Sequence, residues 1–246
     1  MHADLRAATV LAVLLVALVA VHLWGHRATA RSRLVGGPVV ALLLLTFGLA
    51  AGLSWADLGL APESVPAGVA VGLVAGVVVA VAYGVALAVP RVRRAIRDER
   101  YRMPPGMAAR TALVLVPLAT VLPEEVAFRG VLWGQLAQWR GELWATAGSA
   151  ALFGLWHVLP ALEMARRNVL LRGRGGRTAL LTIAATVVAT AFAGVLLAEL
   201  RHRTGSLLAP VGLHWAVNGL GVLAAAWAWR IEGETPPPDG RTSSRG

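Results

Sequence analysis

Seven apolar segments, each about long enough to cross a lipid bilayer, constrain this chain more than any other feature of its sequence. A hydrocarbon core about 30 Å thick requires roughly 20 predominantly apolar helical residues. In lipid, the backbone polar groups of a segment must be satisfied internally, and an α-helix does this within one segment. The predicted spans cover residues 5–24, 35–55, 67–89, 106–138, 143–159, 178–200 and 207–229.

The composition agrees with a polytopic helical bundle. Hydrophobic residues make up 57% of the chain and charged residues only 15%, whereas about a quarter of an ordinary soluble domain is charged. With no cysteine in the sequence, disulfides, thiolate catalysis and cysteine-ligated metal are excluded. We therefore predict an all-α transmembrane bundle of about seven or eight spans, with three N-terminal spans in 1–105, a core in 106–230 and a disordered tail in 231–246.

Two of the predicted spans need comment. The first segment resembles a signal peptide, but its apolar stretch is longer than usual for one, so we predict an uncleaved span. The fourth segment is much longer than one crossing requires, and Pro117 and Pro123 lie inside it. Proline interrupts the helical hydrogen-bond ladder, so we expect this segment to be bent or broken, with an eighth short segment as the alternative.

The arginines predict the orientation in the membrane. All 23 basic residues are arginine, and they concentrate in the loops around residues 27–33, 90–105 and 163–177 and in the tail. With seven spans these regions fall on one face, which the positive-inside rule makes cytoplasmic, and the amino terminus then lies outside. Arg201 and Arg203 are expected in an opposite loop, against the rule. The net charge of +10 is thus explained by loops at a membrane surface and does not indicate nucleic-acid binding.

Few polar residues lie within the apolar segments, and an ionisable group there is a candidate functional residue. Glu125 and Arg129 are four residues apart on one helical face, which predicts a self-neutralising pair. Glu124 points elsewhere around the helix and is left without that partner. A carboxylate in this position suits a general base or acid. The alternative is that Glu124 only faces a water-filled vestibule.

Two further segments carry polar side chains. His157 has Phe153 four residues before it, on the same helical face, where the ring can support the imidazole. His214 and Asn218 are also four apart, and they form either an inter-helix hydrogen-bonding pair or part of a site. Together the three segments supply what is needed to activate water and stabilise an oxyanion. Because His214 lies nearer a span end than the others, convergence requires a last span that starts near Arg201 or a fourth helix that breaks at Pro123.

Three short patterns carry a resemblance to a known family. They are EExxxR in "EEVAFRG" (124–130), FxxxH in "FGLWH" (153–157) and HxxxN in "HWAVN" (214–218). In this order, over about residues 120–222, the chain resembles the CPBP intramembrane proteases. That group contains CAAX prenyl endopeptidases and bacteriocin-processing or self-immunity (Abi) proteins. The resemblance makes residues 106–230 a catalytic transmembrane core and implies a multi-pass protein, expected in the plasma membrane of a bacterium.

The resemblance implies hydrolysis of peptide bonds in a membrane-embedded cavity, with a peptide or membrane-protein substrate. By motif position, Glu124 deprotonates the attacking water, His157 helps to hold it, and His214 and Asn218 donate to the oxyanion. Glu125 and Arg129 brace the site. A divalent metal such as Zn²⁺, held by Glu124, His157 and His214, is the alternative. The metal-free version is favoured because an amide suits oxyanion donation better than zinc ligation.

Two other functions remain open on the sequence. A transporter could use the buried charges as an ion relay, although it has no need of a His/Asn oxyanion pair. A non-catalytic immunity or scaffold protein of the same fold could keep the charge pair for folding alone. The identity of the substrate, its prenylation and the oligomeric state are not indicated by the sequence.

Overall fold

The computed structural model describes residues 2–167 and 175–233, and in these ranges every regular element is a helix. The all-α prediction is confirmed. The α-helices are α1 (His2–Arg27), α2 (Ala30–Ala50), α3 (Val65–Ala88), α4 (Pro90–Ala95), α5 (Pro105–Arg110), α6 (Leu122–Glu125), α7 (Trp133–Arg140), α8 (Glu142–Trp156), α9 (Val158–Arg167), α10 (Gly175–Thr204), α11 (Leu208–Trp215) and α12 (Gly221–Ile231). Two short 3₁₀ turns, η1 (Pro62–Ser64) and η2 (Glu99–Tyr101), lie in the loops.

Seven helical stretches in the described part of the chain are long and apolar enough to cross a membrane: Asp4–Arg27, Ala30–Ala50, Pro62–Ala88, Pro105–Arg140, Glu142–Glu163, Arg177–Thr204 and Leu208–Ile231. Each overlaps one of the predicted spans. Large apolar side chains such as Val77, Val78 and Val81 on α3 are more than half exposed, as lipid-facing residues are. The chain is an integral, multi-pass membrane protein.

The fourth span is not broken at its prolines. Pro105–Arg140 is continuous helix, and three of its stretches are wound as π-helix: η3 (Thr111–Leu115), η4 (Pro117–Val121) and η5 (Val126–Leu132). Pro117 begins η4 and Pro123 is the second residue of α6, so both lie inside the continuous helix, at changes of its winding. Of the expected bend or break, the break is therefore wrong.

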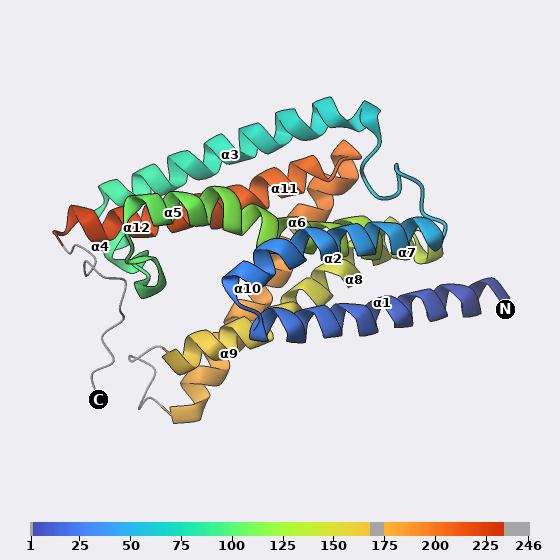
Figure 1. Ribbon diagram of the computed structural model, residues 1–246, viewed down its shortest axis with the longest axis horizontal. Helices are drawn as coiled ribbons and strands as arrows, with labels where there is room; N and C mark the ends of the chain where they lie inside the picture. The colour runs from blue at the N-terminus through green and yellow to red at the C-terminus, as the bar shows by residue number, and fades with distance from the viewer. Residues whose placement is uncertain (1, 168–174, 234–246) are drawn as a thin grey trace.

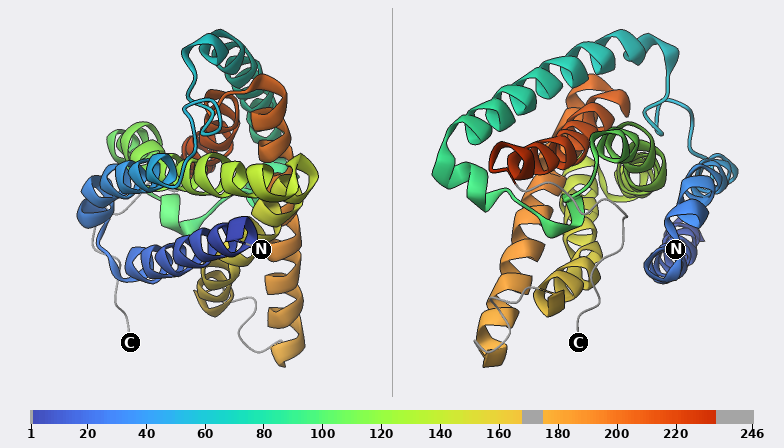
Figure 2. Two further views of the ribbon diagram at one scale, coloured as in Figure 1. Left: turned by 90° about the vertical axis from the view of Figure 1, so that its right-hand side faces the viewer. Right: turned by 60° about the vertical axis from the view of Figure 1, so that its left-hand side comes forward.

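The fourth span lies between two groups of helices (Figures 1 and 2). On one side α2 packs against η4, α6 and η5, with α1 beside η5 and α7. On the other side α3 runs along α11 and η6 (Ala216–Leu220), and α12 packs against α5. Helix α10 crosses α1 and α2 steeply in Figure 2 and packs along α8. The fourth span consequently contacts helices from both ends of the sequence.

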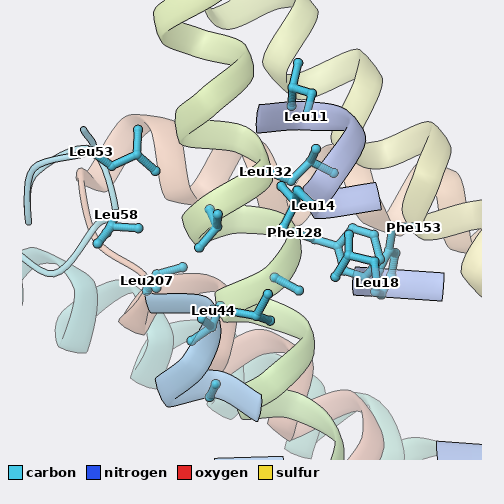
Figure 3. Close-up of a cluster of buried hydrophobic side chains, with 14 of the residues drawn as sticks. Leu11, Leu14, Leu18, Leu44, Leu53, Leu58, Phe128, Leu132, Phe153 and Leu207 are labelled. Carbon is cyan, nitrogen blue, oxygen red and sulfur yellow. The ribbon is translucent and has the colours of Figure 1, made fainter. Parts of the chain in front are cut away.

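A buried hydrophobic cluster joins the N-terminal helices to the fourth span (Figure 3). Leu14 of α1 and Leu44 of α2 meet Phe128 and Leu132 of η5, and Phe153 of α8 closes the cluster from the far side. When the alternative is exposure to water, burying a large apolar side chain contributes about 1.5–3 kcal/mol. When the alternative is exposure to lipid, that gain is absent and close packing supplies the stabilisation. The cluster fixes η5, and with it the adjacent α6.

Arg201 is not the free loop charge expected from the sequence. It lies in the last turns of α10, is only 4% exposed, and donates to the backbone oxygens of Ala56 and Asp57 at 3.0 and 2.7 Å. Its guanidinium stacks on Trp133 at 4.9 Å. This arginine therefore fastens the loop between α2 and α3 to α10.

Some sequence predictions concern residues outside the described ranges. Of the predicted disordered tail, 231–246, only residues 231–233 are described, and they form the end of α12 and the turn after it. Residues 234–246 lie outside the described ranges. Arg172 and Arg174 of the third basic loop also lie outside, in 168–174. The sidedness of the loops stays a prediction.

Candidate active site

Two glutamates and an arginine lie near the middle of the fourth span. Glu124 and Glu125 end α6, and Arg129 follows in η5. Glu125 and Arg129 are both fully buried, and the guanidinium donates from NH1 to Oε1 of Glu125 at 3.0 Å. The predicted pair is confirmed. A charge buried without a partner is far less stable than a paired one, so each residue makes the burial of the other possible.

The pair is held by two further helices. NH2 of Arg129 donates to the backbone oxygen of Gly194 in α10, at 3.4 Å. The ring of Phe153 in α8 lies 4.1 Å from the guanidinium carbon of Arg129, a cation–π contact. Gly194 can offer its carbonyl because α8 and α10 are closely packed there: an added Cβ would come within 3.0 Å of Ala150. The interpretation of Glu125 and Arg129 as a brace therefore has a structural basis.

His214 of α11 completes this group from a distant part of the chain. Its Nδ1 lies 2.7 Å from Oε1 of Glu125, and its Nε2 lies 3.9 Å from Oε2 of Glu124. An ionised carboxylate only accepts hydrogen bonds, so Nδ1 carries the proton toward Glu125. The second nitrogen is thereby aimed at Glu124. His214 is 7% exposed.

His214 reaches the glutamates by a route that the sequence did not predict. The last span starts at Leu208, not near Arg201, and the fourth helix is unbroken. Depth along parallel spans is a poor guide here because the helices are tilted relative to one another (Figure 2). Close packing of α11 on α3 also contributes, since a Cβ at Gly212 would stand 2.7 Å from Cα of Gly72.

Glu124 has a partner that the sequence analysis missed. Nε1 of Trp156, at the end of α8, donates to Oε1 of Glu124 at 3.1 Å. The indole also contacts the rings of Phe128 and His22, with centroids 5.4 and 4.2 Å away. The side chain of Glu124 keeps 14% of its surface exposed, in contrast to Glu125. The position of Trp156 in "FGLWH", directly before His157, was the available signal.

His157 follows α8 directly, next to Trp156. Its Nδ1 lies 2.8 Å from the backbone oxygen of Phe153, and because a carbonyl only accepts, Nδ1 is the donor. The Phe153 ring supports it at a centroid distance of 4.7 Å, as predicted, and lies 5.8 Å from the ring of His214. This leaves Nε2 of His157 as its available nitrogen. Phe153 thus contacts both histidines and Arg129.

Asn218 is not in direct contact with this group. In the described part of the chain no hydrogen bond or ion pair joins its side chain to Glu124, His157 or His214. The helix changes from α11 to the π-helical η6 between His214 and Asn218. The four-residue spacing places two side chains on one face only in a regular α-helix, so the π winding disturbs the expected alignment.

A metal ion does not fit the side chains as arranged. Within residues 2–167 and 175–233, no three His, Asp or Glu side chains are grouped closely enough to hold one. The set Glu124, His157 and His214 is therefore not assembled as ligands, and Nδ1 of each histidine is already engaged. Two surface hollows, one between α1 and α2 and one between α3 and α12, are not lined by these residues.

The comparison with known families covers this whole region. Residues 107–220 match the family model described as Type II CAAX prenyl endopeptidase Rce1-like, and this stretch contains Glu124, Glu125, Arg129, His157, His214 and Asn218. No curated protein and no solved structure matches the chain. The matched family is one of proteases, in agreement with the resemblance of the three motifs. Residues 107–220 are thus similar to the CAAX-protease-like membrane proteins of the CPBP family.

Proposed function

We propose that the chain is an intramembrane endopeptidase that hydrolyses peptide bonds with a water molecule activated by Glu124. The observation that carries the proposal is the arrangement around this residue. Trp156 and His214 approach its two carboxylate oxygens, at 3.1 and 3.9 Å. Glu125 and Arg129 neutralise one another beside it. A partly exposed carboxylate held by neighbours in a nonpolar surrounding suits a general base. The family match supports the reaction class.

Water activation is assigned to Glu124 together with His157. Glu124 takes a proton from the water, and Nε2 of His157 orients it, because Nδ1 is fixed on the carbonyl of Phe153. The oxygen of this water attacks the carbonyl carbon of the scissile peptide. Glu124 then transfers the proton to the leaving nitrogen as the C–N bond breaks, so one carboxylate serves as base and then as acid. No step passes through a metal ion.

Stabilisation of the oxyanion is assigned to His214, and its position supports this role. Its Nδ1 is held by Glu125, and its Nε2 points toward the position beside Glu124 where the oxyanion forms. An N–H at Nε2 is the group that would donate there. Asn218 is the second donor by its place in the motif, and a rotation of its side chain has to bring it there.

The substrate is proposed to be a peptide or a membrane protein that reaches the site from the bilayer or the cytoplasmic side, with no nucleic acid involved. The basic loops are placed on the cytoplasmic side of a bacterial plasma membrane by the positive-inside rule. Because the chain has no cysteine, single cysteines at Arg91 and Gly141 report the orientation directly. A membrane-impermeant thiol reagent added outside intact cells should label the second and not the first.

The activity is tested with the full chain in liposomes. One probe is a quenched fluorescent peptide ending in a farnesylated CAAX sequence, and the other is solubilised bacterial membrane protein whose new termini are mapped by mass spectrometry. Cleavage of at least one is expected, and Glu124→Gln should lower its rate by about 10²–10⁴-fold, because the general base is removed. Glu199→Gln, which alters an exposed glutamate paired with Arg203, is the matched control.

Two results contradict the proposal. One is full activity of Glu124→Gln, which rejects the mechanism. The other is the absence of new termini from either probe with the wild-type chain, which rejects the endopeptidase and favours the immunity or scaffold alternative.

A further inference from the structure

An open groove lies between α3 and α12, on the side of the molecule away from α1 and α2 (Figures 1 and 2). Its volume is about 340 Å³, and its lining is largely apolar, including Tyr83 and Leu87 of α3 and Leu223 and Trp227 of α12. Its position on the outer, apolar surface of two predicted spans exposes it to lipid. None of the proposed catalytic residues contributes to it.

The groove is open because of a small residue on α3. A Cβ added at Gly84 would meet no atom within 4 Å, so the space over this glycine is empty of protein. Trp227 stands on the opposite wall with 55% of its surface exposed. Tyr83 delimits the groove on the side of η6, where its hydroxyl donates to the backbone oxygen of Val217 at 3.0 Å. The groove is therefore a slot between the indole of Trp227 and the part of α3 that carries no side chain at Gly84.

One end of the groove is bordered by arginines. NH1 of Arg93 donates to the backbone oxygen of Leu87, a lining residue, at 2.9 Å. The guanidinium of Arg230 lies 5.4 Å from the ring of Trp227, another lining residue. Trp229 connects the two sides, because its indole donates to the backbone oxygen of Asp98 and Arg97 stacks on its ring. The basic segment is thus attached to the end of the groove by contacts on both walls.

This basic border has an excess of positive charge. Residues 90–102 and 230–232 contain seven arginines and three acids. Glu232 forms ion pairs with Arg93, Arg94 and Arg97, and Asp98 forms one with Arg100. Arg94 keeps 65% of its side chain exposed despite this contact. Arg91 and Arg230 are exposed as well. Among the described residues, Arg91 and Arg230 have no carboxylate in ion-pair contact, and Arg94 shares Glu232 with other arginines.

We propose that the groove between α3 and α12 is a binding site for one anionic phospholipid, with an acyl chain over Gly84 and the phosphate at Arg91, Arg94 and Arg230. An apolar slot that ends in arginines matches a molecule with an apolar tail and an anionic head. Trp227 lies where such a molecule changes from one to the other, and indole rings favour that level of the membrane. A nucleic acid has no apolar tail to place along the lipid-facing side of two spans.

Lipid binding is tested by native mass spectrometry of the full chain, purified in detergent and titrated with phosphatidylglycerol or with phosphatidylcholine of the same acyl chains. The wild-type chain should retain phosphatidylglycerol preferentially. Gly84→Leu fills the slot, and we expect about tenfold weaker retention. Gly76→Leu is the matched control, because a Cβ there also meets no atom within 4 Å, on the same helix but outside the groove.

The role of the arginines is tested separately. Changing Arg91, Arg94 and Arg230 together to Gln should abolish the preference for phosphatidylglycerol, because each exposed arginine contributes about fivefold to anionic-lipid affinity. Arg203→Gln, at an exposed position away from the groove, should leave it unchanged. Equal retention of the two lipids by the wild-type chain, or equal effects of Gly84→Leu and Gly76→Leu, would overturn the proposal.

Discussion

Two arginines in the described part of this membrane protein, Arg129 and Arg201, are almost completely buried, and their surroundings differ. Arg129 in the fourth span is paired with Glu125, and through it with His214. Arg201 in α10 has no carboxylate in ion-pair contact within the described residues, and donates to two backbone oxygens in the loop after α2. Both rest on an aromatic ring, Phe153 in one case and Trp133 in the other. Both also keep Nε without a hydrogen-bond partner there.

The difference shows two ways to stabilise a guanidinium in a nonpolar surrounding. A carboxylate compensates the full charge but brings in a second ion, and at Glu125 that ion also orients His214. Backbone carbonyls compensate less, and they add no group that can titrate. The first arrangement lies in the region proposed to transfer protons during catalysis. The second is a structural contact that holds the loop after α2 against α10.

The largest effect is expected at Arg129. Arg129→Met leaves Glu125 buried without its cation, and the free energy of unfolding should fall by about 3–5 kcal/mol. Unfolding in SDS-containing mixed micelles measures this. Removing both ions, with Glu125→Leu and Arg129→Leu together, should be less damaging than Arg129→Met alone. If the double variant is the less stable of the two, the pair is not the self-neutralising unit described here.

A smaller effect is expected at Arg201. Arg201→Met leaves two backbone carbonyls without a donor but no unpaired carboxylate in contact, so we expect a loss of about 2 kcal/mol. Limited proteolysis should also become faster in the loop between α2 and α3. Arg203→Met is the control, since that side chain is 75% exposed. A loss at Arg201 as large as that at Arg129 would remove the distinction between the two sites.

Trp156→Phe tests the polar contact of Glu124 without emptying the space beside it. The change keeps an aromatic ring next to Phe128 and His22 but removes the N–H that donates to Glu124. On the proposed function, kcat should fall about tenfold, because a hydrogen bond to a charged group contributes about 1.5–3 kcal/mol. KM and the midpoint of thermal unfolding should stay close to wild type. An unchanged kcat would show that this bond does not position Glu124.

The smallest effect is expected at a partly exposed pair that includes neither arginine. His26 and Glu163 join α1 to α9 at 3.2 Å, and the carboxylate side chain is 50% exposed. Glu163→Gln should change the free energy of unfolding by less than about 1 kcal/mol, since water and salt screen such pairs. The same mixed-micelle titration measures it. A larger loss would mean that exposure is not what separates weak pairs from strong ones in this chain.

Local spacing along one helix was enough to predict some of these features. The seven spans and the Glu125–Arg129 pair follow from hydropathy and from a four-residue separation, and both are confirmed. Contacts between distant segments were not accessible in this way. The four-residue spacing paired His214 with Asn218, and the motifs placed it in one site with Glu124, but neither predicted the contact with Glu125, 89 residues away. Arg201 was assigned to a loop because its carbonyl partners lie in another part of the chain. The π-helical stretches have no pattern that hydropathy records.

The contact between His214 and the two glutamates also has a meaning for biogenesis. Glu124 and Glu125 are translated long before His214, which belongs to the last of the seven spans. Until that span has entered the membrane, the fourth span carries two carboxylates and one arginine, and the proposed oxyanion donor is missing. On the proposed function, membrane insertion of the final helix is the step that completes the site, and chains released from the ribosome before His214 is made should be inactive.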